Sequence, residues 1–155
     1  MRDKGWYDKE GVTILEGRWQ DVISSPAFQS IGKFDVVYTD TFSEDYTQLR
    51  DLFKELPNIL AGPDGRFSFF NGLGATSKFV AFAGHHLLDQ RTDALFYDVY
   101  TRVSEIDLDG LGLDVKWSDV DVIHEAKENR WGRSRQYFSL PIYRLPLATF
   151  KKGAK

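Results

Sequence analysis

The sequence contains no cysteine among its 155 residues. This absence excludes a disulfide framework, a cysteine nucleophile and a thiolate metal site. No apolar run reaches the length of a membrane span, and no apolar signal-peptide segment is recognisable. We therefore expect an intracellular, soluble chain without a membrane partner.

An excess of basic charge is also missing. Lys and Arg number 20 against 23 Asp and Glu, which gives a formal net charge of -3, and the basic residues are scattered along the chain. Nucleic-acid binding needs a dense basic face, so we expect no nucleic-acid partner. The stretch GRFSFF at 65–70 faintly resembles the RNA-stacking strand of an RNA-recognition motif, but no second aromatic strand motif accompanies it.

Two common catalytic patterns are absent as well. No GxSxG motif occurs, so serine hydrolysis has no support. His85 and His86 have no third ligand at the spacing of a metal site, and we interpret them as a surface pair rather than as a zinc site.

The chain does have apolar residues in periodic patterns. Hydrophobic residues make up 42% of it and aromatic residues 15%, enough for a sizeable core in one domain or in a piece of a larger one. A helical period predicts one helix from Ser43, its N-cap, to Leu60, and a second helix at 93–106. Short apolar runs predict strands at 12–15, 34–39, 66–70 and 113–117.

The last part of the chain is expected to differ from its middle. Residues 118–135 are polar and predict irregular structure, whereas 137–150 alternate in a way typical of a strand. Pro141 and Pro146 lack backbone donors, so we predict that this strand lies at an edge of the sheet. Residues 151–155 are expected to form a disordered tail.

Strand, helix and strand alternate in the middle of the chain, which predicts an α/β fold with a parallel sheet. Ligands in such sheets bind beyond the carboxyl ends of the strands. Asp40 follows the strand at 34–39 and Asn71 follows the strand at 66–70. Both residues are therefore candidates for binding a ligand.

Asp40 is the sharpest candidate. A carboxylate at a strand end, beside Thr41 and a helix N-terminus, suits both the binding of a cation and the capping of the helix, and the spacing does not decide between these roles. Trp19, Gln20 and Asp21 are a second candidate set, because a Trp ring stacks on a flat ring while Gln or Asp accepts from an exocyclic amine. The alternative is a core Trp beside a turn.

The stretch NGLG at 71–74 is the third candidate. Backbone amides at a strand end suit a carboxylate or a peptide oxygen. A plain turn explains the same residues, because a lone GxG is weak evidence for a binding loop.

Five ordered blocks of the sequence resemble a known family. They are GRWQDV, FDVVYTDTFSEDY, LPNILAGPDGRFSFFNGLGAT, FYDVYTRVSEIDL and YFSLPIYRLPL. These blocks make the chain similar to the fungal protein arginine N-methyltransferase 2 family, of the δ-nitrogen type, and more distantly to guanidinoacetate N-methyltransferase. The resemblance covers nearly the whole chain and is specific, because five blocks agree in order.

The resemblance implies a Rossmann-like class I methyltransferase fold with S-adenosyl-L-methionine as the methyl donor. It further implies methyl transfer to the δ nitrogen of an arginine in a ribosomal large-subunit protein, and a location in the cytoplasm and nucleus. The oligomeric state stays open.

The resemblance also assigns roles to the candidates that contact the donor and the acceptor nitrogen. Asp40 matches the acidic residue that holds the substrate guanidinium and is the predicted catalytic residue. Trp19 and Gln20 fall where the family contacts the adenine, although relatives often carry Glu where this chain has Gln20. Asp40 and Thr41 complete the predicted cofactor-binding set.

The acceptor side is assigned in the same way. Asn71, Gly72, Leu73 and Gly74 match the loop that lines it, and Glu44 is a further substrate-binding candidate. A fixed acid suits this chemistry, because guanidinium is cationic and hardly ever deprotonates, and the donor's sulfonium is positive too. A carboxylate offsets that repulsion and aligns the attacking nitrogen with the methyl group.

The sequence departs from the family in its first residues. It opens with MRDKGWYDKEGVTIL, which corresponds to the approach to the third strand, and no glycine-rich turn precedes this stretch. We therefore expect 1–150 to be the C-terminal half of a methyltransferase domain, with a sheet that lacks its first strands and has an antiparallel C-terminal edge strand. The isolated chain is expected to bind S-adenosyl-L-methionine weakly or not at all.

A second departure is an insertion. Residues 80–96 (VAFAGHHLLDQRTDALF) separate two blocks that follow each other almost directly in the family. They are either translated non-coding sequence or a real surface loop. A peptide that spans His85 and His86, found in the native protein, would rule out the first explanation.

Different functions therefore stay open at this point. The first is an enzyme fragment whose parent methylates arginine in a protein. The second is a non-catalytic chain that acts only as a binding or interaction module. The third is methylation of a small guanidino compound, which FSEDYTQLRDLFKELPNIL and YRLPL disfavour because they are closer to the protein-directed family.

Overall fold

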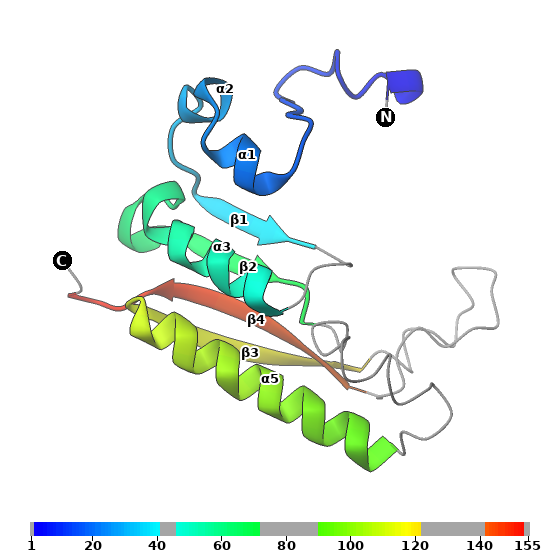
Figure 1. The fold of residues 1–155 in the computed structure, drawn as a ribbon, viewed down its shortest axis with the longest axis vertical. Coiled ribbons are helices and arrows are strands. Elements are labelled where there is room, and N and C mark those ends of the chain that lie inside the picture. Colours follow the sequence, from blue (N-terminus) through cyan, green and yellow to red (C-terminus); the bar gives the residue numbers. More distant parts are fainter. Residues whose placement is uncertain (1, 41–45, 72–89, 122–141, 154–155) are drawn as a thin grey trace. The chain divides into compact units, whose positions relative to one another are not determined.

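The structure of the chain is a computed structural model that describes residues 2–40, 46–71, 90–121 and 142–153. The chain divides into two compact units, unit 1 (Met1–Lys33) and unit 2 (Phe34–Lys155). Figure 1 colours the chain from its N-terminus in blue to its C-terminus in red. Each unit is described below by itself.

Unit 1 consists of short helices joined by turns. Ser25 starts the last of them, because its hydroxyl accepts the backbone N–H of Phe28 at 3.2 Å and Pro26 fills the first helical position, where no donor is needed. The helical segments are η1 (Arg2–Lys4), α1 (Trp19–Ile23) and α2 (Pro26–Gln29).

The strand predicted at 12–15 is not formed, and this prediction is wrong. Ile14 and Leu15 are half-buried, but among the described residues no strand pairs with this run. An apolar run becomes a strand only where a neighbour shares its backbone hydrogen bonds. The apolar residues are used instead to line a pocket, which is described below.

The described residues of unit 2 form a four-stranded sheet of order β1-β2-β4-β3. β1 and β2 are parallel, whereas β4 is antiparallel to both β2 and β3. The α/β class, the parallel pair and the antiparallel C-terminal strand are thereby confirmed. The strands are β1 (Val36–Thr39), β2 (Arg66–Phe69), β3 (Leu113–Asp121) and β4 (Ile142–Phe150).

Two helices lie between these strands in the described part of the chain. α3 (Tyr46–Ile59) follows β1, and its described start agrees with the predicted helix, whose proposed cap Ser43 lies outside the described residues. α5 (Gln90–Gly110) is longer than predicted and leads into β3. Gly112 ends this helical region with a φ of +80°, a conformation that favours glycine.

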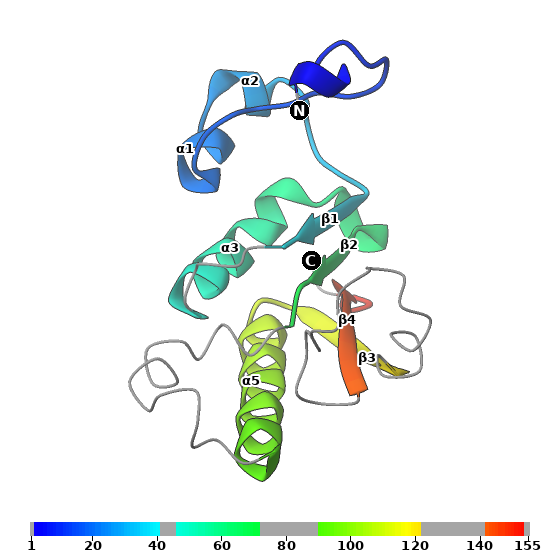
Figure 2. The same ribbon diagram turned by 90° about the vertical axis from the view of Figure 1, so that its right-hand side faces the viewer.

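Both helices cover the same face of the sheet, as the rotated view shows (Figure 2). On this face Phe53 of α3 is fully buried against Phe67 and Phe69 of β2, with ring centroids 5.6 and 5.4 Å away. Phe69 in turn meets Trp117 of β3 edge to face at 6.1 Å. These aromatic contacts form the centre of the core, and Leu108 and Leu113 extend it beneath α5.

The prediction that the C-terminal strand lies at an edge is wrong, because β4 lies between β2 and β3. Pro146 is fully buried opposite Trp117. The ladder between β2 and β4 covers only Ala148 and Thr149, so β2 does not require a donor from Pro146. Pro141 lies outside the described residues.

Tertiary pairing also moves the limits of the last elements. β3 continues to Asp121, opposite Ile142 of β4, although 118–121 was predicted to be irregular. The predicted disordered tail begins with a residue that is held in place: Lys151 donates its backbone N–H to the carbonyl of Gly112 at 2.9 Å and pairs with Asp109 at 2.5 Å. In both cases, the end of β3 and the start of the predicted tail, the structure is decided by residues that are distant in sequence.

None of the described helices has the length and apolar content needed to cross a membrane.

The aromatic core gives the first prediction. Replacing Phe53 by Ala should lower the free energy of unfolding by about 3–5 kcal/mol, because it leaves a cavity between α3 and β2. Urea denaturation measures this loss. Lys54→Ala on the exposed side of the same helix is the matched control and should change it by less than about 0.5 kcal/mol. A Phe53→Ala loss below about 1 kcal/mol would contradict the core described here.

Candidate functional site

Asp40 follows β1 directly, at the carboxyl end of the parallel pair. Its side chain is exposed, and no described residue donates a hydrogen bond to it. Burial is the main cause that raises the pKa of Tyr38, and the negative charge of Asp40 raises it further. Alternation along β1 places these two side chains on one face of the sheet. Thr41 and Glu44 lie outside the described residues.

Asn71 follows β2 at the same edge of the sheet. The ladder ends with Thr39 opposite Phe69, and the backbone N–H of Phe70 then donates to the carbonyl of Thr39 at 2.9 Å. Asp40 and Asn71 are therefore neighbours along this edge, as expected for parallel strands. The alternation of side chains sends them to opposite faces, with Asp40 on the face that α3 and α5 leave uncovered.

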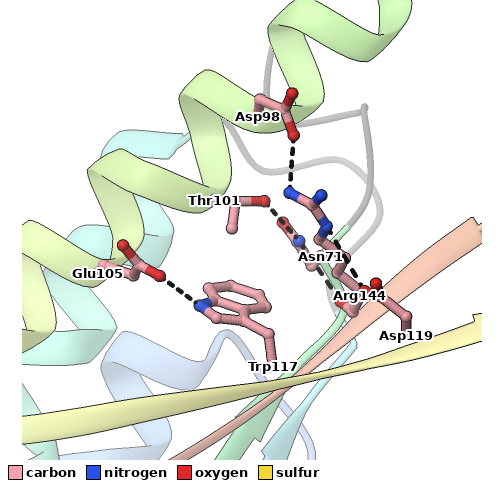
Figure 3. Close-up of polar contacts among 7 residues, drawn as sticks. All are labelled: Asn71, Asp98, Thr101, Glu105, Trp117, Asp119 and Arg144. Carbon is pink, nitrogen blue, oxygen red and sulfur yellow. Dashed lines mark hydrogen bonds and ion pairs between the residues drawn. The ribbon is translucent and has the colours of Figure 1, made fainter.

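The side chain of Asn71 is buried and forms hydrogen bonds within the fold (Figure 3). Its Nδ2 donates to Thr101 Oγ1 at 3.2 Å and to the carbonyl of Arg144 at 3.5 Å, and its backbone N–H donates to the Tyr143 hydroxyl at 2.9 Å. Asn71 thus ties β2 to α5 and β4. These donors fix the strand end, and the proposed binding residues Gly72, Leu73 and Gly74 that follow lie outside the described residues.

Charged and polar contacts around Asn71 were not predicted from the sequence. Arg144 contacts Asp98 at 2.7 Å and Asp119 at 3.5 Å, so it joins β4 to α5 and β3 (Figure 3). Trp117 Nε1 donates to Glu105 at 2.7 Å. All these side chains lie far apart in sequence or on different elements, so no local motif could have indicated them. Their exposure limits each ion pair to a modest contribution.

A second set of contacts holds the start of α3, where the chain returns after Asp40. The Tyr46 hydroxyl donates to Asp107 Oδ2 at 2.7 Å, Arg50 contacts the same carboxylate at 3.1 Å, and the Tyr46 ring meets Tyr100 edge to face. Burial is the main cause that raises the pKa of Tyr46, and the hydrogen bond to Asp107 raises it further. The cluster fastens α3 to α5.

Trp19 and Gln20, the predicted adenine contacts, form the first turn of α1 in unit 1. Both are half-buried. The indole Nε1–H of Trp19 is shielded from solvent and has no hydrogen-bond partner in the described part of the chain. An unpaired buried donor costs free energy, so this N–H is suited to an acceptor supplied by a ligand.

Unit 1 also contains a pocket of about 380 Å³ beside α1. Apolar side chains form part of its wall, and the carboxylates of Glu16 and Asp21 form another part. The hydroxyl of Tyr7 donates a hydrogen bond to the Glu16 carboxylate. Asp21 is the other acidic side chain in the wall of the pocket. The residues that line the pocket are Tyr7, Ile14, Leu15, Glu16, Asp21, Val22, Ser25 and Ala27.

The candidate residues are thus found in two groups. Trp19 and Gln20 lie in unit 1, whereas Asp40 and Asn71 lie in unit 2. Within the described parts of the chain, no three His, Asp or Glu side chains are placed to hold a metal ion. His85 and His86 lie outside those parts.

Comparison with curated proteins gives consistent results. A protein from Aspergillus oryzae named protein arginine N-methyltransferase 2 is 38% identical over 151 residues, which are 97% of this chain and 32% of that protein. By sequence, the chain is similar to the protein arginine N-methyltransferase 2 of several fungi over nearly its whole length. Relatives of the same name from Yarrowia lipolytica and Cryptococcus neoformans are 40% and 37% identical, over 97% and 96% of the chain and 29% and 39% of their own length.

The family resemblance of the sequence is therefore confirmed, and the mixed sheet is that of a partial class I methyltransferase fold. The chain spans about a third of the length of the arginine methyltransferases that it matches. No protein-family model and no solved structure matches it.

The contact between Tyr46 and Asp107 gives a pH-dependent prediction. Tyr46→Phe should lower the free energy of unfolding by about 1 kcal/mol at pH 8, because one hydrogen bond is lost. The folded state raises the pKa of Tyr46 above its ordinary value of 10.0, so this contribution is complete below pH 10. It should be lost as the pH rises above 10, because the unfolded chain then ionises first.

Urea denaturation between pH 8 and pH 11 measures the difference between the wild type and Tyr46→Phe. The difference should shrink with rising pH. Phe53→Ala contains no titrating group and is the control whose effect should stay constant. A Tyr46→Phe difference that grows above pH 10 would contradict the prediction.

Proposed function

We propose that this chain supplies the acceptor-side half of a protein arginine methyltransferase that uses S-adenosyl-L-methionine. The single observation that carries the proposal is Asp40, an exposed carboxylate at the carboxyl end of a parallel strand with no hydrogen-bond donor among the described residues. Ligands of α/β sheets bind at this edge. The names of the relatives supply the reaction class.

Asp40 has a defined task in this proposal. The guanidinium of an acceptor arginine is always charged and donates N–H bonds in a flat fork, which a carboxylate accepts at two oxygens. Such a pair fixes the guanidinium plane and keeps positive charge on the nitrogens that face Asp40. The remaining nitrogen would then face the methyl group; transfer would form the N–C bond as the donor's C–S bond breaks, with release of the N–H proton of that nitrogen. Prepositioned charge of this kind is the main source of rate in such sites.

The unit 1 pocket fits one part of the methyl donor. Its apolar wall of Ile14, Leu15 and Val22 suits the faces of an adenine ring, and Asp21 suits its exocyclic amine. Trp19 is not among the residues that line this pocket, so its role as an adenine contact rests on the family resemblance. When bound, the donor supplies an activated methyl group; the chain's own part is to hold and orient it.

The finer points of the proposal rest on the family resemblance. They are transfer to the δ nitrogen, a ribosomal large-subunit protein as the acceptor, and a location in the cytoplasm and nucleus. Mass spectrometry of a methylated acceptor peptide separates δ from terminal nitrogens by the fragments that each methylarginine loses.

The role of Asp40 is tested in a chimera in which this chain replaces the matched residues of the Aspergillus oryzae relative. Asp40→Asn should lower kcat for transfer of labelled methyl groups to an arginine peptide by about 100-fold or more, because the carboxylate charge is lost while the shape is kept. Asp35→Asn, an exposed acid that precedes the same strand, should leave the rate within about twofold. Equal rates for both variants would remove Asp40 from the mechanism.

The predicted adenine contact of Trp19 is tested by calorimetry with S-adenosyl-L-methionine. In the chimera, Trp19→Ala should weaken donor binding by about tenfold, because a stacking surface and an N–H donor are lost. Trp6→Ala is the matched control, since Trp6 is exposed and stacks under Lys9 at 4.5 Å. The isolated chain should bind the donor weakly or not at all, and an affinity equal to that of the complete relative would contradict this.

A further inference from the structure

The carboxyl edge of the parallel pair β1–β2 is the part of unit 2 that carries Asp40. The ladder ends with Thr39 opposite Phe69, and the backbone N–H of Phe70 still donates to the carbonyl of Thr39 at 2.9 Å. One further step of this register puts Phe70 in line with Asp40. Asn71 follows at once and is the first of the residues that the family resemblance assigns to the acceptor. The positions of Phe70 and Asn71 therefore decide how an acceptor would lie relative to Asp40.

One side chain of β4 holds both of these residues. The hydroxyl of Tyr143 accepts the backbone N–H of Asn71 at 2.9 Å. The ring of Tyr143 stacks on the ring of Phe70, with the centroids 5.8 Å apart and the ring planes inclined by 21°. Phe70 and Tyr143 are half-buried, and Asn71 is buried. A single tyrosine thus contacts two consecutive residues at the end of β2, one through its ring and one through its oxygen.

The hydroxyl of Tyr143 takes the place of a backbone acceptor. Antiparallel neighbours normally share their backbone N–H and C=O groups, but the ladder between β2 and β4 covers only Ala148 and Thr149 of β4. The backbone N–H of Asn71 lies beyond the end of this ladder and is buried, so it needs an acceptor from elsewhere. If the phenol oxygen of Tyr143 were removed, a buried donor would lose its acceptor.

The end of β2 is held from both faces of the sheet. Phe69 packs against α3, so alternation directs Phe70 to the opposite face, where the ring of Tyr143 stacks on it. The side chain of Asn71 returns to the helical face, and its Nδ2 donates to Thr101 Oγ1 of α5 at 3.2 Å (Figure 3). Tyr143 therefore supplies the contact on one face and Thr101 the contact on the other.

Tyr143 is itself firmly placed. It lies opposite Val120 of β3, within a ladder that pairs all nine residues of β4. The next residue, Arg144, contacts Asp98 of α5 at 2.7 Å and Asp119 of β3 at 3.5 Å. A side chain that positions others has to be held by its own surroundings, and the β3–β4 pairing and these ion pairs provide that support.

We propose that Tyr143 is a positioning residue for the acceptor side of the methyl-transfer site. Its hydroxyl fixes the backbone at Asn71, and its ring fixes Phe70 in line with Asp40. The proposal rests on the proposed function, because it requires that Asp40 holds the guanidinium of the acceptor. Tyr143 acts through Asn71 and Phe70, without touching the reacting atoms. Loss of its hydroxyl should therefore impair acceptor binding and spare both donor binding and the chemical step.

The kinetic test uses Tyr143→Phe in the chimera with the Aspergillus oryzae relative, because this change removes the hydroxyl and keeps the ring. KM for the arginine peptide should rise by roughly tenfold, since the peptide must then order a strand end that has lost a hydrogen bond. The value of kcat and the dissociation constant of S-adenosyl-L-methionine should stay within about twofold of those of the unmutated chimera.

Tyr46→Phe is the matched control for stability. It removes a hydroxyl of the same kind, whose hydrogen bond to Asp107 joins α3 to α5 and does not involve Asn71. Thermal melting should show a loss of stability in both variants, whereas KM for the peptide should rise only in Tyr143→Phe. A purely structural role of Tyr143 would lower the melting temperature of both variants and change KM in neither.

Amide hydrogen exchange, followed by mass spectrometry, tests the strand end without donor or acceptor. In the Tyr143→Phe chimera, the peptide that contains Asn71 should exchange at least about fivefold faster, because its buried backbone N–H has lost its acceptor. A peptide from β3 should exchange at the rate of the unmutated chimera, since the ladder between β3 and β4 is kept.

An unchanged KM in Tyr143→Phe would overturn the proposal, whether or not exchange at Asn71 becomes faster. A lower kcat with an unchanged KM would also overturn it, because the hydroxyl would then act in the chemical step. Failure of the proposed function has a different signature. In that case Asp40→Asn would keep the rate of the unmutated chimera, while exchange at Asn71 would still respond to Tyr143→Phe.

Discussion

The parallel pairing of β1 with β2 is the constraint on which the rest of unit 2 depends. It brings two strand ends to one edge of the sheet, and therefore places Asp40 beside the residues that directly follow Phe69. The pairing is held by the ring of Phe53, which inserts from α3 against the rings of β2. That aromatic contact packs α3, the helix between Asp40 and β2, against the sheet.

The sequence predicted this part of the fold because its signals are local. Two short apolar runs predicted β1 and β2, and the helical spacing of apolar residues between them predicted α3; each of these elements forms. Asp40 was found for the same reason, since a strand end can be recognised without knowing what surrounds it. The family blocks added the reaction class, which no periodicity contains.

Predictions failed where partners distant in sequence decide the structure. The run at 12–15 has a strand-like composition but no pairing strand, whereas β3 extends through polar residues because β4 lies beside it. Pro146 indicated an edge strand, yet the short ladder with β2 leaves room for a proline inside the sheet. The donors of Asn71 are used by Thr101, Tyr143 and Arg144, contacts that the sequence did not indicate. None of these partners lies within reach of a local motif.

The unequal lengths of the ladders in the sheet have a mechanical consequence. β4 pairs with β3 along nine residues but with β2 only at Ala148 and Thr149, so most of the β3–β4 ribbon has a strand neighbour on one side alone (Figure 1). Two-stranded ribbons twist more strongly than strands within a wider sheet. The ion pair of Arg144 with Asp98 links this ribbon to α5, so the twist of the ribbon and the position of that helix depend on each other.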